Sequence, residues 1–196
     1  MLKLYDNASS TNALKVRFLL AELGLEYEKV DVDLDPKPAW YAEVHPFGLV
    51  PALVDGDLVL TESNTALRYL AGREGRDDLY PADPARRARI DVLLDSLSLE
   101  VRPALWAAEE PVLYGTPEPD DWRTPLAAAL AGYERLVADD GYAAGAFSIA
   151  DCAIAGRMWH LHELPIELGA YPKLTRALAL ATARPAYAAA VGTAHA

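Results

Sequence analysis

The sequence contains a single cysteine, Cys152, among its 196 residues. One cysteine excludes an intramolecular disulfide and also the Cys-x-x-Cys pair of redox enzymes. Cys152 lies within the apolar run 149–155, which predicts a buried and unreactive thiol rather than a nucleophile.

Long hydrophobic runs are missing as well. No apolar stretch approaches the roughly 18–20 residues that are needed to span a bilayer. The chain starts with a strand-like segment instead of the charged and then apolar segments of a signal peptide. We therefore expect a cytoplasmic protein without a membrane partner.

Basic residues are few, because 18 Lys and Arg stand against 29 Asp and Glu and give a formal net charge of −11. Nucleic acids and anionic membranes attract clustered basic residues, so neither is an expected partner. With 52% hydrophobic and 24% charged residues, the composition is that of a globular chain long enough for one or two domains.

The spacing of apolar residues changes character near residue 80. Before it, strand-like and helical segments alternate, and Asp55-Gly56 between the last two strands favours a β-hairpin. This pattern predicts a small mixed sheet with helices packed on it. The predicted strands cover 2–5, 30–34, 52–54 and 58–60, and the predicted helices cover 12–23 and 63–71.

After a polar segment with Gly and Pro, the spacing is helical nearly everywhere. Ser148 and Asp151 have the spacing of a capping box at a helix start. The predicted helices cover 85–106, 122–137, 148–162 and 173–183, followed by a short helix after Pro185. The expected fold class is α/β plus all-α, with a sheet-containing domain over 1–75, a linker over 76–85 and a helical bundle over 86–196.

The opening segment combines a short strand, a polar loop and a helix. Ser9 and Ser10 lie in this loop, just before the helix, where unpaired backbone N–H groups gather and can hold an anion. A serine at this place can also be a simple helix cap. We expect Asn12 to supply the cap, which leaves the Ser10 hydroxyl free to face a ligand.

Four segments together resemble the cytosolic glutathione S-transferases, of the bacterial and serine-dependent type. The segments are 10–17 (STNALKVR), 46–53 (PFGLVPAL), 62–70 (ESNTALRYL) and 148–151 (SIAD). They follow the family's order and spacing over essentially the whole chain. The resemblance implies a thioredoxin-like N-terminal domain, an all-helical C-terminal domain, a homodimer, and glutathione as the co-substrate.

The resemblance also implies that Ser10 stabilises the thiolate of glutathione, with Ser9 as the competing hydroxyl. The thiolate is the nucleophile, and a free thiol with a pKa near about 8.5 is little ionised at neutral pH. A hydrogen bond from a hydroxyl, together with the helix N-terminus, would lower the pKa of the thiol by roughly one to three units.

Two further motifs imply contacts to the rest of the tripeptide. In the family the proline at position 51 is cis, and the backbone of Val50 pairs with the cysteinyl part of glutathione like an added strand. Glu62 would take the γ-glutamyl ammonium group and Ser63 the neighbouring carboxylate. Alternatively, Pro51 is an ordinary trans proline, and Ser63 or Thr61 is only a helix cap.

Leu49 departs from the family pattern, in which Lys or Gln at this position engages the glycyl end of glutathione. Leucine cannot donate a hydrogen bond, so Lys37 and His45 become the candidates for that carboxylate. The pocket for the second substrate is expected between the domains, lined by Asn7, Arg102, Trp106 and Tyr114. No metal site is predicted, because the two histidines of 160–162 would not share a helix face.

These expectations describe a glutathione transferase that joins the glutathione thiolate to small hydrophobic electrophiles in detoxification. A glutathione-dependent isomerase, dehalogenase or peroxidase on the same fold is one alternative. A non-catalytic interaction module of the same fold is another, in which Ser10 is only a cap, and Leu49 keeps this alternative open.

Overall fold

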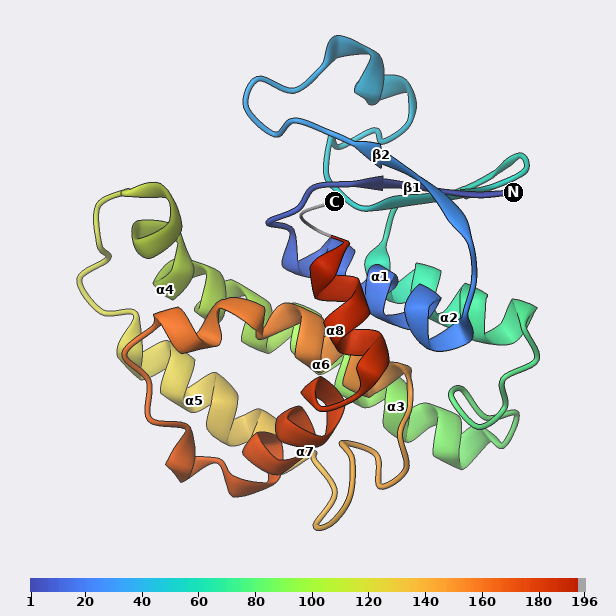
Figure 1. Cartoon of the computed structure of the whole chain (residues 1–196). Helices are drawn as coiled ribbons and strands as arrows, with labels where there is room; N and C mark the ends of the chain where they lie inside the picture. Colours follow the sequence, from blue (N-terminus) through green and yellow to red (C-terminus); the bar gives the residue numbers. More distant parts are fainter. Residues whose placement is uncertain (194–196) are drawn as a thin grey trace.

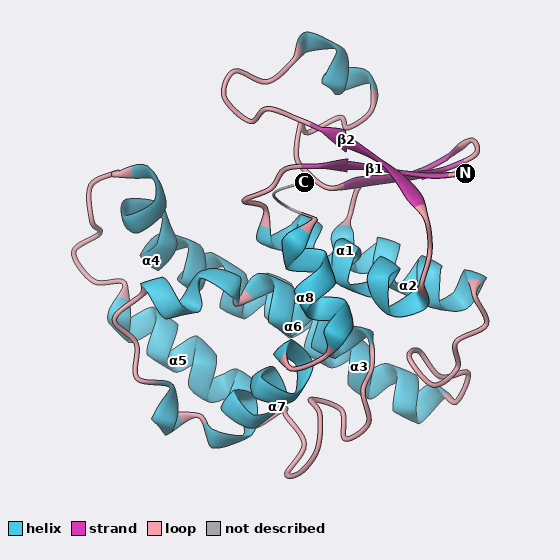
Figure 2. Cartoon of the chain, viewed as in Figure 1, coloured by secondary structure: helices cyan, strands magenta, loops and turns pink. Residues whose placement is uncertain are grey.

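The computed structural model describes residues 1–193 and places a small sheet on top of a larger group of helices (Figure 1). The sheet has four strands in the order β2-β1-β3-β4. Strand β1 runs parallel to β2 and antiparallel to β3, which forms a hairpin with β4. The strands are β1 (Leu2–Asp6), β2 (Tyr27–Asp31), β3 (Ala52–Asp55) and β4 (Leu58–Leu60). Figure 2 shows the same division, with strands confined to one end, and it confirms the expected α/β plus all-α class with a thioredoxin-like sheet.

The hairpin lies where the sequence predicts it, with Gly56 at a φ of 60° in its turn. The predicted strand over 30–34 is misplaced, because β2 already begins at Tyr27 and ends at Asp31. Its register is set by β1, whose last residue, Asp6, pairs with Asp31. One more hydrogen bond, from the N–H of Val32 to the carbonyl of Asp6 at 2.8 Å, closes the pairing. Because β1 ends at Asp6, β2 cannot pair with it any further along the chain.

Helices α1 (Thr11–Leu23) and α2 (Ser63–Arg73) lie side by side under the sheet (Figure 1). Helix α1 is almost entirely buried, since it also packs against the helical half of the chain. At Gly156 this packing is so close that an added Cβ would lie 2.7 Å from the backbone nitrogen of Lys15. Only glycine fits there.

The remaining helices form the lower layer. The predicted helix over 85–106 is part of a longer run, in which a π-helical turn, Leu97–Val101, joins two helices. This run does not stop at Pro111, because a proline in the last turn removes only one intrahelical hydrogen bond, and it ends at the left-handed Gly115. The helices are α3 (Pro84–Ser96), α4 (Arg102–Tyr114), α5 (Arg123–Glu134), α6 (Ile149–Arg157), α7 (Pro172–Thr182) and α8 (Pro185–Gly192), with short 3-10 turns at η1 (Ala39–Glu43), η3 (Trp159–Glu163) and η4 (Leu168–Ala170).

The predicted capping box is present at the start of α6. The side chain of Asp151 accepts the backbone N–H groups of Ser148 at 2.9 Å and Ala143 at 2.8 Å, and the Ser148 hydroxyl accepts the N–H of Ala150. Cys152, the next residue, is buried, and burial raises the pKa of its thiol well above the usual value. The expected burial of this thiol is thereby confirmed.

The two halves of the chain are joined along α1. Helices α6 and α8 both pack against it, and α8 lies beside it in Figure 1. Arg184, just before α8, forms an ion pair with Glu22 of α1 and lies over the Phe147 ring, 3.8 Å from its centroid. Within residues 1–193, no helix combines the length and the apolar character that crossing a membrane requires. The domain limits 1–75, 76–85 and 86–196 stay a prediction.

Candidate active site

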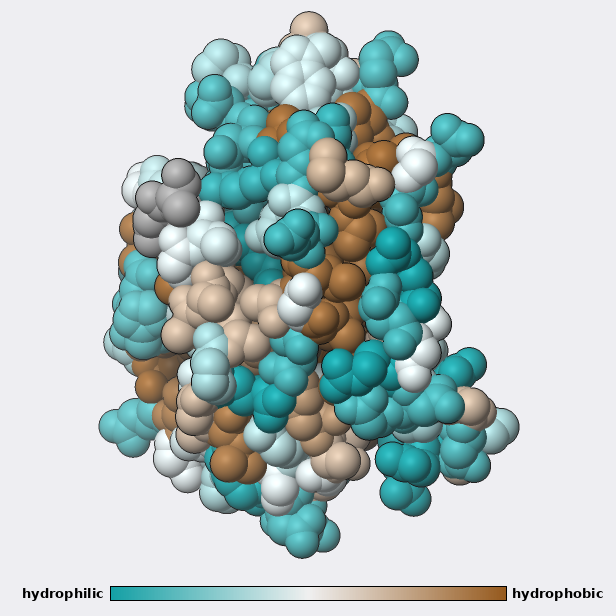
Figure 3. Space-filling model, turned by 45° about the vertical axis from the view of Figure 1, so that its right-hand side comes forward, coloured by the Kyte–Doolittle hydropathy of each residue, from teal (hydrophilic) through white to brown (hydrophobic). Residues whose placement is uncertain are grey.

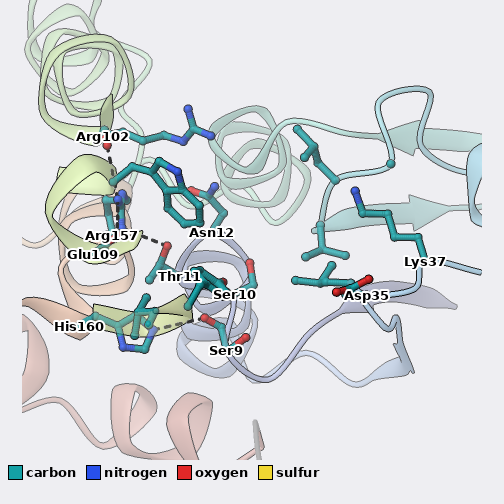
Figure 4. A pocket seen from close by; sticks show the side chains of 17 residues that line it. Ser9, Ser10, Thr11, Asn12, Asp35, Lys37, Arg102, Glu109, Arg157 and His160 are labelled. Carbon is teal, nitrogen blue, oxygen red and sulfur yellow. Dashed lines mark hydrogen bonds and ion pairs between the residues drawn. The ribbon is translucent and has the colours of Figure 1, made fainter. Parts of the chain in front are cut away.

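A cavity of about 370 Å³ opens beside the N-terminus of α1. Its polar lining comes from the start of α1, the loop before η1, helices α4 and α6, and η3 (Figure 4). Its apolar lining consists of Leu34, Leu49, Val50, Trp106, Leu113 and Tyr114. The cavity therefore has residues from both halves of the chain.

Ser10 is the N-cap of α1, so the expectation that Asn12 would be the cap is wrong. The Ser10 hydroxyl oxygen accepts the N–H of Ala13 at 3.2 Å, and its carbonyl accepts the N–H of Leu14 at 2.9 Å. Ser10 has the extended backbone of a cap residue, whereas Asn12 already lies inside the first turn. Because a hydroxyl has two lone pairs and one proton, capping does not use the proton. Ser10 lines the cavity, and among residues 1–193 no acceptor takes the proton of its hydroxyl.

Ser9 lines the cavity too, but its hydroxyl and its N–H both donate to a residue of its own loop. Its hydroxyl donates to Asn7 Oδ1 at 2.7 Å, and its N–H donates to the same oxygen at 3.1 Å. Asn7 in turn donates from Nδ2 to the carbonyl of Val32 at 3.0 Å. Asn7, which the sequence places in the second-substrate pocket, therefore shapes the serine loop and is not part of the cavity lining.

A buried ion pair supports this loop from below, and sequence reasoning did not assign it. Arg17 donates from Nη1 to both carboxylate oxygens of Asp6 at 2.9 Å, and neither side chain is exposed. The guanidinium also reaches the carbonyls of Asn7 and Ala8 at 3.4 Å. Burial is the largest influence on Asp6 and raises the pKa of its carboxyl, while the Arg17 charge opposes this change. Arg17 thus fixes the backbone that carries the two serines.

The peptide bond between Val50 and Pro51 is cis, as the resemblance implies. Val50 lines the cavity. In the described part of the chain, its N–H and C=O pair with no other backbone group. A second cis bond joins Asp35 and Pro36, at the same end of the molecule, and was not expected.

Helix α2 begins at Ser63, and Glu62 is its N-cap residue without a side-chain cap hydrogen bond. The alternative that Ser63 or Thr61 caps this helix is therefore wrong. The first intrahelical bond runs from the N–H of Ala66 to the carbonyl of Glu62. The N–H groups of residues 63–65 have no backbone partner between residues 1 and 193. This helix end can receive an anion, although Glu62 and Ser63 are not part of the cavity lining.

The two candidates for the glycyl end of glutathione are placed very differently. Lys37 lines the cavity, and its side chain runs so close to Gly48 that an added Cβ would lie 3.5 Å from Nζ. His45 is buried, and its ring nitrogens contact the carbonyl of Thr61 at 3.1 Å and the N–H of Phe47 at 3.2 Å. The structure does not bring His45 into the cavity.

Helix α4 contributes Arg102, Trp106 and Tyr114 to the lining. The rings of Trp106 and Tyr114 contact each other, with centroids 5.8 Å apart. These three residues, predicted for the second-substrate pocket, thus lie in one wall of the cavity.

The lining also contains residues that the sequence analysis did not assign to the site, among them Arg157, Glu109 and His160. Arg157 of α6 forms two hydrogen bonds with Glu109 of α4, at 3.0 and 2.7 Å, and both side chains are buried. Nη1 of Arg157 also lies 3.3 Å from the hydroxyl of Thr11 in α1. The pair connects three helices around the cavity. Its partners are 48 positions apart, and no local pattern could have joined them.

His160 lies next to the serine loop (Figure 4). Its Nδ1 is 2.6 Å from Glu163 Oε1, and its Nε2 is 3.4 Å from the carbonyl oxygen of Ser9. Within the part of the chain that the structure describes, no group of His, Cys, Asp and Glu side chains is arranged to hold a metal ion.

A four-stranded thioredoxin-like sheet, a helical half, and a cavity at the first helix are the architecture of a glutathione transferase. The model of the glutathione S-transferase N-terminal domain matches residues 1–72. Glutathione S-transferase 3 of Zea mays is 37% identical over 164 residues, which cover 76% of this chain and 73% of that protein. A stringent starvation protein A homolog of Haemophilus influenzae is 31% identical over 85% of this chain and 78% of its own.

A solved structure agrees with these relatives. A glutathione transferase homolog of Drosophila mojavensis with bound glutathione superposes with a TM-score of 0.87 at 26% identity, covering 98% of this chain and 94% of that one. The chain belongs to the glutathione S-transferase family.

Proposed function

We propose that this chain is a serine-dependent glutathione transferase that joins the thiolate of glutathione to small hydrophobic electrophiles. The Ser10 hydroxyl is the observation that carries the proposal. It lies in the cavity lining, its oxygen caps α1, and its proton has no acceptor within residues 1–193. An anion at this position would receive the hydroxyl proton and would also face the N-terminus of α1.

The chemistry follows from this placement. A charge-assisted hydrogen bond stabilises an anion by about 1.5–3 kcal/mol, and a helix N-terminus adds about 0.3–1 kcal/mol. Together they would lower the pKa of the glutathione thiol by roughly one to three units. The thiol then loses its proton to solvent, and the sulfur attacks the electrophilic carbon. A leaving group departs with the electrons of the bond that breaks.

Glutathione would lie across the edge of the sheet. The unpaired backbone groups of Val50 would bind the cysteinyl residue as an added strand does. The free N–H groups at the start of α2, with Ser63, would receive the γ-glutamyl carboxylate, and Glu62 its ammonium group. Lys37, which reaches into the cavity from the opposite loop, would take the glycyl carboxylate in place of Leu49.

A second candidate function is that of an interaction module that does not catalyse. Leu49 favours it, since this side chain cannot donate to glutathione. The likeness to a relative named for stringent starvation, rather than for transfer, points the same way. An isomerase, dehalogenase or peroxidase would use the same thiolate and differ in the second substrate. The cytoplasmic location and a role in detoxification stay predictions.

Two measurements on the purified chain test the proposal: retention on immobilised glutathione, and turnover of 1-chloro-2,4-dinitrobenzene with glutathione. The transferase is expected to show both. A chain that shows neither supports the interaction module. Retention without turnover of this or any other electrophile in a broad panel would contradict conjugation and favour one of the other thiolate reactions.

We also propose a homodimer. Large apolar side chains are exposed on the described chain, among them Phe47 and Leu99, at 75% and 71%. Figure 3 shows a band of hydrophobic residues along the face turned forward, bordered by hydrophilic ones. Sedimentation equilibrium should give twice the 21.3 kDa of one chain. A monomer at micromolar concentration would contradict the dimer.

A further inference from the structure

The cavity differs in charge from the rest of the molecule. The chain has a net charge of −11, yet the lining contains Lys37, Arg102 and Arg157 against Asp35 and Glu109. The amine of Lys15 is buried nearby, and its pKa is lowered to about 7, first by burial and then by the charges of Arg157 and Arg102. Such a local excess of positive charge calls for a bound anion.

Two of the three cations that line the cavity are already accounted for, one by an ion pair and one by the proposed contact with glutathione. Arg157 is satisfied by two hydrogen bonds with Glu109. Lys37 lies on the far side of the cavity, next to Asp35, where the glycyl end of glutathione is proposed (Figure 4). Arg102 remains. Within residues 1–193 its guanidinium forms no ion pair and no hydrogen bond, while its backbone carbonyl accepts a hydrogen bond from Arg157.

The position of Arg102 suits a ligand with one charged end. It is the first residue of α4, directly after the π-helical turn. Trp106 follows four residues later, on the same face of the helix, and contacts Tyr114. Arg102 lies on the side of Ser9–Asn12 that is opposite to Lys37 (Figure 4). A guanidinium therefore stands at the end of an apolar and aromatic wall.

We propose that the second substrate of this cavity is an electrophile that carries a carboxylate, and that Arg102 binds this carboxylate while Trp106 and Tyr114 hold the apolar remainder. The inference rests on the proposed transferase function. A guanidinium can give a carboxylate two parallel hydrogen bonds, which also orient the reacting carbon. Arg102 is thus a specificity-determining residue, and Ser10 remains the group that faces the sulfur.

The test uses a matched pair of compounds, 4-chloro-3-nitrobenzoate and its methyl ester. In both, the glutathione sulfur forms a bond to the ring carbon and chloride leaves with the electron pair, so no oxidant or reductant is needed. The acid and the ester differ in intrinsic reactivity. For this reason, the comparison is made between variants for each compound, never between the two compounds.

Arg102→Gln is expected to raise the KM for the acid by about 10- to 100-fold, as the loss of a charge-assisted hydrogen bond predicts. The KM values for the ester and for glutathione should change by less than about twofold. Arg102→Lys should recover part of the affinity for the acid, because it keeps the charge but loses the fork of donors. Arg135→Gln, at an exposed arginine outside the cavity lining, is the matched control and should change none of these values.

Each outcome decides something. If neither compound turns over and the protein is not retained on glutathione, the transferase function fails, and the inference fails with it. If the ester turns over but Arg102→Gln leaves the acid unaffected, or affects both compounds alike, the inference is overturned and the transferase function stands. If the variant instead raises the KM for glutathione, Arg102 serves the tripeptide, and the inference is again wrong.

Discussion

The hydroxyl of Ser9 donates a hydrogen bond to Asn7 Oδ1 at 2.7 Å, within the loop that leads into α1. The hydroxyl of the neighbouring Ser10 instead accepts a hydrogen bond, from the N–H of Ala13. Adjacent serines in one cavity thus differ in whether a proton is left for a ligand. The difference favours Ser10 as the residue that contacts the glutathione sulfur.

Ser10→Ala should lower kcat/KM by about 10- to 100-fold, and Ser9→Ala by less than about threefold, since only the first removes a donor to the thiolate. The thiol pKa, read from the pH dependence of kcat/KM, should rise in Ser10→Ala alone. Ser10→Asp is the control for folding, because aspartate also caps helices but repels a thiolate. Loss of activity in Ser9→Ala with full activity in Ser10→Ala would reverse the assignment.

The ion pair between Arg157 and Glu109 should be important for stability. Arg157→Met leaves the Glu109 carboxylate buried without a partner and should lower the free energy of unfolding by about 3–5 kcal/mol. The double variant Arg157→Met with Glu109→Leu should recover more than half of this loss. Urea denaturation measures both. Arg123→Met, which removes an exposed ion pair with Glu118, is the matched control and should cost less than about 1 kcal/mol. Equal losses at the two sites would contradict the prediction.

Lys15 should make stability depend on pH. Burial, followed by the charges of Arg157 and Arg102, lowers the pKa of its amine to about 7, against 10.5 for a free side chain. The folded chain therefore binds fewer protons than the unfolded chain between these two values, and stability contributed by Lys15 rises with pH in this window. It is lost as the pH falls through about 7.

The measurement is the free energy of unfolding of the wild type minus that of Lys15→Met, taken from about pH 6 to pH 10. This difference should increase with pH by a few kcal/mol, because one pKa unit corresponds to about 1.4 kcal/mol. Lys3→Met, at a partly exposed lysine of β1, gives the baseline. A difference that stays flat would show that the buried amine keeps an ordinary pKa.

Asp151→Ala should destabilise the chain without changing the chemistry. The substitution leaves the N–H groups of Ala143 and Ser148 buried and without an acceptor, at a cost of about 1–3 kcal/mol for each group. Thermal unfolding should occur at a lower temperature, while kcat of the folded enzyme stays unchanged. Asp121→Ala removes an exposed acceptor of the Thr124 N–H and should cost clearly less. A normal melting temperature in Asp151→Ala would refute the structural role of the capping box.

The features that the sequence predicted correctly depend on residues close together in the chain. The hairpin at Asp55-Gly56, the capping box at Ser148 and Asp151, and the extent of α1 each need only a few neighbouring residues, and the family resemblance supplied the cis bond before Pro51. The two-domain fold followed from the change in apolar spacing near residue 80 together with that resemblance.

The features that the sequence missed depend on partners far away. The position of β2 was set by its pairing with β1, and the place of His45 by the carbonyl of Thr61. Nothing near Glu109 indicates that Arg157 will neutralise it, and nothing near Ser9 indicates that His160 will contact its carbonyl. One error is local: Ser10 and Asn12 lie two positions apart, and local patterns leave a helix start open within this range.

The sequence by itself therefore indicated the family, through the resemblance of four segments. It also determined the order of the elements and the loop that carries the two serines, because these follow from local hydrogen bonding and apolar spacing. Only the three-dimensional structure of residues 1–193 decided how the two hydroxyls are bonded and which cations of the cavity are paired. Hydrogen bonds and ion pairs satisfy whichever groups the packing brings within about 3 Å, and packing joins residues without regard to their distance along the chain.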